Sequence, residues 1–101
     1  MSKKLKILAV CGFGVGSSMI LKMKIEEVLK QNNIKADVFT ADVGSASSTP
    51  CDIIFTSKEL EKNIRSKVNV PVVAIKNFID KVEIVENGLP VVRDVLNSFK
   101  E

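Results

Sequence analysis

The chain has 101 residues, of which 46% are hydrophobic and 27% charged, a balance typical of one folded domain and unlike a disordered chain. Its formal net charge is only +3 and it contains neither Trp nor Tyr, which argues against a nucleic-acid-binding protein. Two cysteines are too few for a disulfide framework, and no apolar run approaches the roughly 20 residues of a membrane span, so we expect a cytoplasmic protein that is not inserted in a membrane.

The first half of the chain predicts two strands and one helix. Residues 5–10 are a short apolar run with β-branched side chains, which indicates a strand. A helix is expected over 17–31, ended by Asn32-Asn33, because one face repeats apolar residues at helical spacing: Leu21, Ile25, Val28 and Leu29. A second strand is expected over 36–41, and residues 44–50 are small and polar, which predicts a loop with at most one helical turn.

The second half predicts two more strands and two helices. A third strand is expected over 52–55, a run that is apolar apart from Asp52, as buried parallel strands are. The next residues, Thr56-Ser-Lys-Glu59, match a capping box that opens a helix to about Lys67. A fourth strand is expected over 71–75. Residues 77–87 fit either a short helix or an irregular segment, and Gly88 with Pro90 predicts a break followed by the start of a last helix.

This alternation of strands and helices predicts an α/β fold in a single domain, residues 1–101. Right-handed crossovers favour a three-layer arrangement, with a four-stranded parallel sheet of order 2-1-3-4 and helices on both faces, Rossmann-like or flavodoxin-like. Open sheets of this kind bind ligands at the carboxyl ends of the strands, where the strand order reverses. Cys11 follows the first strand and should lie at that edge.

The run CGFGVGSS, residues 11–18, is the candidate site and is called here the phosphate loop. Glycines let a backbone turn tightly and point its N–H groups at an anion, and the helix that follows adds positive potential. The same field lowers a thiol pKa, so Cys11 is the predicted nucleophile although the chain has no histidine. The predicted phosphate ligands, with Ser17 or Ser18 also available to cap the helix, are Gly12, Phe13, Gly14, Val15, Gly16, Ser17 and Ser18.

Several other interpretations of the phosphate loop remain open. Cys11 could be an inert core thiol in a tight turn, and the loop could serve a non-catalytic anion-binding regulatory module. Dinucleotide binding is weakly indicated, because G-x-G-x-x-G lacks its third glycine. A small cysteine phosphatase would use C-x5-R-S, but Ser17 replaces the arginine that would stabilise the hydrolytic transition state. Asp80 could serve such an enzyme as general acid or be simply solvated. A loop that holds phosphate without this arginine favours a phosphoryl carrier.

The stretch KILAVCGFGVGSSMILKMKIEEVL, residues 6–29, resembles the enzyme IIB subunits of the bacterial phosphoenolpyruvate-dependent sugar phosphotransferase system. Within that family it is most similar to the ascorbate-specific type, and the galactitol type carries a related loop. The resemblance implies that Cys11 accepts a phosphoryl group from a phosphohistidine of a IIA protein or domain. It also implies transfer to the sugar, here ascorbate, in a membrane IIC transporter. No metal and no cofactor is implied.

A few residues outside the loop are secondary candidates. Met19 and Met23 could form a docking surface for IIA and IIC or could fill the core. Four polar residues follow the third and fourth strands and could rim the site: Thr56, Ser57, Lys76 and Asn77. For Thr56 and Asn77, helix capping is the favoured alternative. Cys51 is expected at the opposite edge of the sheet, too far from Cys11 for a disulfide.

Overall fold

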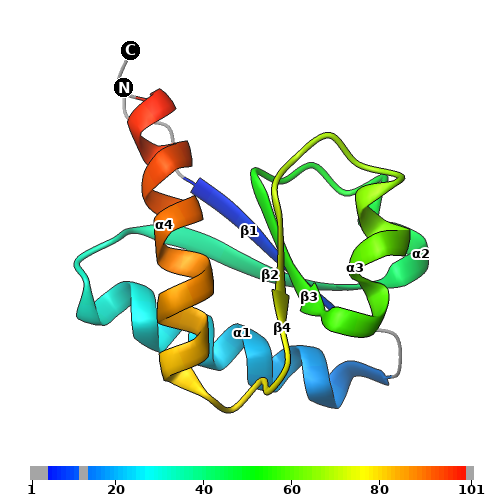
Figure 1. The fold of residues 1–101 in the computed structure, drawn as a ribbon, viewed down its shortest axis with the longest axis horizontal. Coiled ribbons are helices and arrows are strands. Elements are labelled where there is room, and N and C mark those ends of the chain that lie inside the picture. The colour runs from blue at the N-terminus through cyan, green and yellow to red at the C-terminus, as the bar shows by residue number, and fades with distance from the viewer. Residues whose placement is uncertain (1–4, 12–13, 100–101) are drawn as a thin grey trace.

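The computed structural model describes residues 5–11 and 14–99, with side chains for residues 5–10 and 19–98. Within this part of the chain, strands and helices alternate (Figure 1). In chain order the elements are β1 (Leu5–Cys11), α1 (Gly14–Gln31), β2 (Ala36–Asp42), α2 (Val43–Ala46), β3 (Ile53–Ser57), α3 (Lys58–Arg65), β4 (Val72–Ile75) and α4 (Lys81–Phe99).

The four strands form one parallel sheet of order β2-β1-β3-β4, which confirms the predicted topology. Side chains alternate between the two faces of each strand. On β3, Ile53 and Phe55 contact the layer formed by α1 and α4, whereas Ile54 contacts the layer formed by α2 and α3. The predicted three-layer arrangement is therefore also confirmed.

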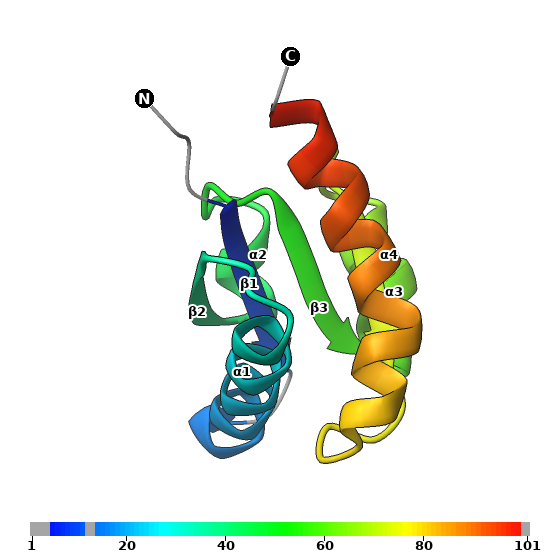
Figure 2. The same ribbon diagram turned by 90° about the vertical axis from the view of Figure 1, so that its left-hand side faces the viewer.

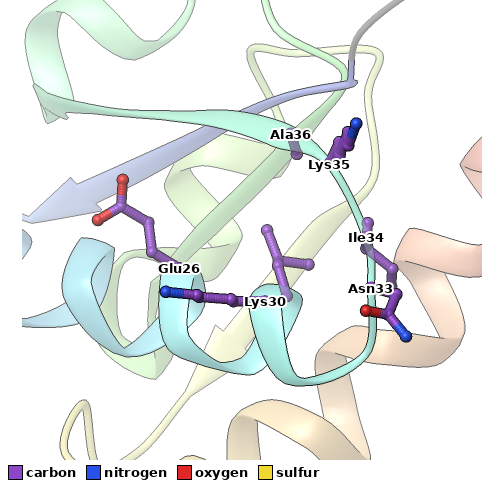
Figure 3. A pocket seen from close by; sticks show the side chains of 7 residues that line it. Glu26, Lys30, Asn33, Ile34, Lys35 and Ala36 are labelled. Atoms are coloured by element: carbon purple, nitrogen blue, oxygen red, sulfur yellow. The ribbon is translucent and has the colours of Figure 1, made fainter.

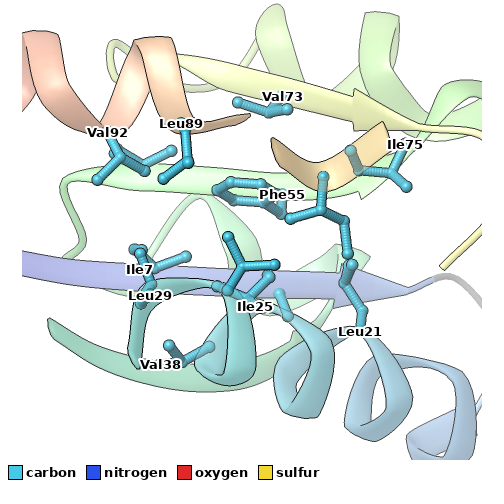
Figure 4. Close-up of a cluster of buried hydrophobic side chains, with 14 of the residues drawn as sticks. Ile7, Leu21, Ile25, Leu29, Val38, Phe55, Val73, Ile75, Leu89 and Val92 are labelled. Atoms are coloured by element: carbon cyan, nitrogen blue, oxygen red, sulfur yellow. The ribbon is translucent and has the colours of Figure 1, made fainter. Parts of the chain in front are cut away.

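The larger core lies between the sheet and the helices α1 and α4, with the ring of Phe55 at its centre (Figure 4). Leu21 and Ile25 of α1 approach it from one side, and Leu89 of α4 from another. Burying one such side chain fully contributes about 1.5–3 kcal/mol. The apolar face predicted for the first helix is thus the face that α1 buries.

The start of α3 differs from the sequence prediction. Thr56 does not open a capping box, because it belongs to β3 and its side chain is completely buried. The N-cap of α3 is Ser57, which makes no side-chain capping hydrogen bond, and α3 ends at Arg65 instead of Lys67. The Thr56 hydroxyl donates instead to the backbone oxygen of Val10 on the neighbouring strand.

The last helix also corrects the prediction, because α4 runs without a break through Gly88 and Pro90. Gly88 is a point of close approach: a Cβ atom there would lie 2.6 Å from the Cε2 and Cζ atoms of Phe55. Pro90 lies on the exposed side of α4. It has no N–H to donate to the carbonyl four residues earlier in the helix, and on this side water can bind that carbonyl instead. Both residues are therefore compatible with the helix interior here.

The two ends of the described chain lie at the same edge of the sheet. β1 begins at Leu5 at the amino edge, and α4 starts beyond the carboxyl end of β4 and runs back toward that amino edge. The two views agree on this arrangement (Figures 1 and 2). In the described chain, the carboxyl edge is the side on which each strand leads into a helix.

Candidate functional site

The connection between β1 and α1 places Cys11 at the carboxyl edge of the sheet. β1 ends at Cys11, which pairs with Asp42 of β2, and α1 begins at Gly14. Within the described residues, the pairing of β1 with β3 ends earlier, at Ala9 opposite Phe55. The two central strands therefore separate just before Cys11, at the topological switch point where open α/β sheets bind ligands.

The phosphate loop passes directly into the first turn of α1. The first four N–H groups of a helix have no acceptor within it and carry the positive end of the helix dipole, so the backbone of residues 14–17 offers anion-binding donors near the end of β1. Because α1 begins at Gly14, neither Ser17 nor Ser18 can be its N-cap, and that prediction was wrong. Gly12 and Phe13, and the side chains of the other loop residues including Cys11, lie outside the described residues.

Thr56 neither rims the site nor caps a helix. Its side chain is 0% exposed, and its Oγ1 donates a hydrogen bond of 3.1 Å to the carbonyl oxygen of Val10. Val10 is the residue immediately before Cys11, so this buried hydroxyl holds the backbone from which the phosphate loop departs.

The turn after β4 forms another part of the carboxyl edge, and Glu83 of α4 organises it. The Oε2 atom of Glu83 accepts a 2.6 Å hydrogen bond from the N–H of Lys76, and Oε1 accepts one of 3.0 Å from the N–H of Asn77. The side chain of Asn77 accepts from the N–H of Ile79 within the same turn. Asn77 is therefore a turn residue, and its predicted role as a helix cap was wrong.

Asp80 is the residue that caps α4. Its Oδ1 atom accepts hydrogen bonds from the backbone N–H groups of Val82, at 3.0 Å, and Glu83, at 3.3 Å. An N-cap carboxylate of this kind supplies acceptors for the free N–H groups of the first helical turn. The capping geometry explains Asp80 without a role as general acid.

Asp42 is a residue near the site that sequence reasoning did not single out. It lies opposite Cys11 in the ladder between β1 and β2 and also caps α2. Its Oδ1 accepts a 2.7 Å hydrogen bond from the N–H of Ser45, and hydrogen bonds from the Ser45 side chain and backbone lower the Asp42 pKa. The pairing of Asp42 with Cys11 follows from the strand register, which no local sequence pattern reveals.

Apolar side chains are exposed at the same end of the molecule. Met19 and Met23 of α1 are 43% and 54% exposed, so the core-filling interpretation of these methionines was wrong. Ile79 and Val82, in and after the turn that follows β4, are 63% and 64% exposed. An ion pair of 3.1 Å between Lys81 and Glu27 joins the start of α4 to α1.

Two surface hollows of similar volume lie at opposite edges of the sheet, so volume alone does not identify the functional site. A shallow depression of about 450 Å³ lies where α1 passes into β2 (Figure 3), lined by residues such as Glu26, Lys30 and Lys35. It is at the amino edge, where Asn33 adopts φ 58° and ends α1 as predicted. A second hollow, of about 440 Å³, lies at the carboxyl edge between Lys58 and Lys76.

Cys51 lies just before β3, at the amino edge as expected. It is a free cysteine, and burial, with a smaller contribution from the neighbouring Asp52 carboxylate, raises its pKa. It packs beside the smaller core under α2 and α3. Its surroundings thus suppress the thiolate, unlike those of a reactive cysteine.

A family model decides the classification. Residues 6–87 match the model described as "PTS system, Lactose/Cellobiose specific IIB subunit". The chain belongs to this IIB family of the phosphotransferase system (PTS). It is 37% identical over 91 residues to the "Ascorbate-specific PTS system EIIB component" of Escherichia coli O157:H7, covering 88% of this chain and 90% of that protein. The protein of the same description from Shigella flexneri is 38% identical over 90 residues, 87% of this chain and 89% of the relative.

Solved structures show the same fold for this IIB chain. The lactose-specific IIB component domain from Streptococcus pneumoniae superposes with a TM-score of 0.65 at 17% identity, covering 94% of this chain and 97% of that domain. An enzyme IIB subunit from Escherichia coli K12 gives a TM-score of 0.53 at 17% identity, with 100% of both chains covered. The described part of this IIB chain has no helix that is long and apolar enough to cross a membrane.

Proposed function

We propose that this IIB chain is a phosphoryl carrier that acts through Cys11 in a sugar-transporting phosphotransferase system. A IIA protein or domain would donate the group from a phosphohistidine, and a membrane IIC transporter would hold the acceptor sugar. The similarity to two ascorbate-specific EIIB components supports ascorbate as that sugar. The chain would work in the cytoplasm, in peripheral contact with IIC.

The observation that carries this proposal is the junction of β1 and α1. Cys11 ends a central strand where β1 and β3 separate, and the free N–H groups at the start of α1 follow within the same short connection. Such donors stabilise a thiolate before transfer and the oxygens of a bound phosphoryl group after it. Asp42, which pairs with Cys11, would oppose the thiolate, but α2 partly compensates its charge through Ser45.

The two transfer steps balance without an oxidant or a reductant. In the first, the Cys11 thiolate attacks the phosphorus of the donor phosphohistidine; an S–P bond forms, the P–N bond breaks, and the leaving imidazole nitrogen keeps the electron pair. In the second, a sugar hydroxyl attacks the phosphorus, an O–P bond forms and the S–P bond breaks. The thiolate leaves with its electron pair, and the hydroxyl proton passes to a base. Phosphorus is neither oxidised nor reduced.

The exposed apolar residues support contact with partner proteins at this edge. Met19 and Met23 follow the phosphate loop on α1, whereas Ile79 and Val82 lie in the turn after β4 and at the start of α4; all four side chains are exposed. Flexible methionine side chains can adapt to different surfaces, which suits a carrier that meets a donor and an acceptor in turn. Both partners must reach the same sulfur.

The test is intact-protein mass spectrometry after incubation with phosphoenolpyruvate, the general phosphotransferase proteins and a cognate IIA. We expect the wild type and Cys51→Ser to gain the mass of one phosphoryl group and Cys11→Ser to gain none. Phosphopeptide mapping to another residue would contradict the role of Cys11. Adding membranes that contain IIC and ascorbate should then remove the group and yield a phosphorylated sugar.

The same experiment separates the carrier from the two alternatives. A cysteine phosphatase would lose the phosphoryl group rapidly to water without an acceptor, because hydrolysis is its function. A non-catalytic anion-binding module would never acquire the group. A phosphorylated state that persists until the acceptor is added is the result that supports a carrier.

A further inference from the structure

The buried hydroxyl of Thr56 lies at the carboxyl end of β3, next to the strand that carries Cys11. Among the side chains that the structure describes, it is the one fully buried polar group. We propose that Thr56 is a positioning residue for phosphoryl transfer, which fixes the peptide that joins Val10 to Cys11. This inference rests on the proposed function, in which Cys11 carries the phosphoryl group.

The separation of β1 from β3 creates the need for such a group. The two strands pair as far as Ala9 opposite Phe55, whereas β1 continues beside β2 to Cys11. Had the pairing with β3 continued, the carbonyl of Val10 would accept a backbone N–H from that strand. The separation opens the switch point but leaves this carbonyl in need of another donor.

The Thr56 side chain supplies that donor. Its Oγ1 lies 3.1 Å from the carbonyl oxygen of Val10, across 46 positions of sequence. Because a peptide unit is planar, and no cis peptide bond occurs in the described chain, holding this carbonyl also fixes the direction of the Cys11 N–H. The hydroxyl thus allows the strands to part while the first backbone group of the phosphate loop stays in place.

Simple packing would not require a hydroxyl at this position. Thr56 shares the face of β3 with Ile54, whose side chain is buried in the smaller core. Valine has nearly the same shape as threonine and a high preference for strands, so an apolar residue would satisfy both demands. The distinct property of threonine here is the hydrogen bond to Val10.

Two matched pairs of variants test this inference in the full chain. Wild type and Thr56→Val differ in the hydroxyl but hardly in shape, and Thr56→Ser and Thr56→Ala likewise differ only in the hydroxyl. The measurements are the rate of phosphorylation by phosphorylated IIA and the pH profile of Cys11 alkylation by iodoacetamide. Ile64→Val, a buried change on α3, controls for lost stability, which urea unfolding measures for every variant.

We expect Thr56→Val to slow phosphorylation by about tenfold and to move the alkylation midpoint up by about one pH unit. Thr56→Ser should keep both values near those of the wild type, and Thr56→Ala should behave like Thr56→Val. If the valine variant does not fold, the serine and alanine pair carries the same comparison.

Three results would overturn the inference: unchanged kinetics and pH profile in a folded Thr56→Val, equal losses in the serine and alanine variants, or the same profile shift in an equally destabilised Ile64→Val. The proposed function fails differently. If wild-type protein is not phosphorylated at Cys11, the carrier assignment is wrong whatever the Thr56 variants do.

Discussion

Replacing Gly88 by alanine should destabilise the protein, although alanine is normally the better residue inside a helix. The added Cβ would lie 2.6 Å from the Cε2 and Cζ atoms of Phe55, about 1 Å closer than an ordinary carbon–carbon contact of about 3.5–4 Å. The Phe55 ring is only 1% exposed and is enclosed by α1 and α4. It cannot move aside without displacing other core residues.

The magnitude follows from two opposing contributions. Removing glycine from a helix interior stabilises by about 0.8–1.0 kcal/mol, whereas overpacking a well-packed core costs about 1–3 kcal/mol. We therefore expect Gly88→Ala to lower the free energy of unfolding by about 1 kcal/mol, which in a domain of this size lowers Tm by about 4–8 °C. Urea unfolding followed by circular dichroism measures the first quantity and a thermal scan the second.

Two further variants isolate the contact with Phe55. Asn87→Ala, at the exposed neighbouring position of the same helix, should be neutral or stabilising by a few tenths of a kcal/mol, since it gains helix propensity without a clash. In a Phe55→Leu background, Gly88→Ala should cost less stability. The double variant should therefore lose less free energy of unfolding than the sum of the losses in the two single variants. A stabilising Gly88→Ala in the otherwise unchanged protein would refute the reasoning.

Three more predictions concern the chemistry of the carboxyl edge. Iodoacetamide at neutral pH should modify Cys11 faster than Cys51, whose pKa is raised by burial. Inorganic phosphate should slow only the reaction of Cys11. Equal rates without a phosphate effect would indicate that Cys11 is an inert turn cysteine. Wild-type protein should hydrolyse p-nitrophenyl phosphate poorly, and Ser17→Arg should increase this activity only partly, so rapid wild-type turnover would favour a phosphatase. The pKa of Asp42 is lowered in the folded protein by Ser45, so its stabilising contribution is complete above the unfolded pKa of about 3.9 and is lost as pH falls through the folded value. Asp42→Asn should therefore lessen the loss of stability on acidification, and an unchanged pH dependence in urea titrations would contradict this.

The strands and their order could be predicted because those signals are local. The apolar run ending at Val10 and the helical repeat of Leu21 and Ile25 each specify one element. Right-handed connections between such elements leave few possible topologies. The position of Cys11 at the switch point follows from this order and from where β1 ends.

Two of the errors arose where a residue serves a distant element. Thr56 has the sequence context of a helix cap but donates to Val10 on another strand. Gly88 has the context of a helix break but provides room for Phe55. The relation of Asp42 to Cys11 depends on strand register, which no local pattern records. Local errors occurred as well, since α1 begins at Gly14 and Asn77 lies in a turn instead of capping a helix.

The common location of Leu5 and Phe99, the two ends of the described chain, has a practical consequence for protein engineering. Since β1 begins and α4 ends at the amino edge, a tag, a fluorescent protein or a second domain attached by a linker departs from the end of the molecule opposite Cys11. Fusing a donor domain there would raise its effective concentration without covering the reacting sulfur, provided that the linker spans the length of the sheet. Linker length, rather than the choice of terminus, would then control the rate of transfer in such a tethered protein.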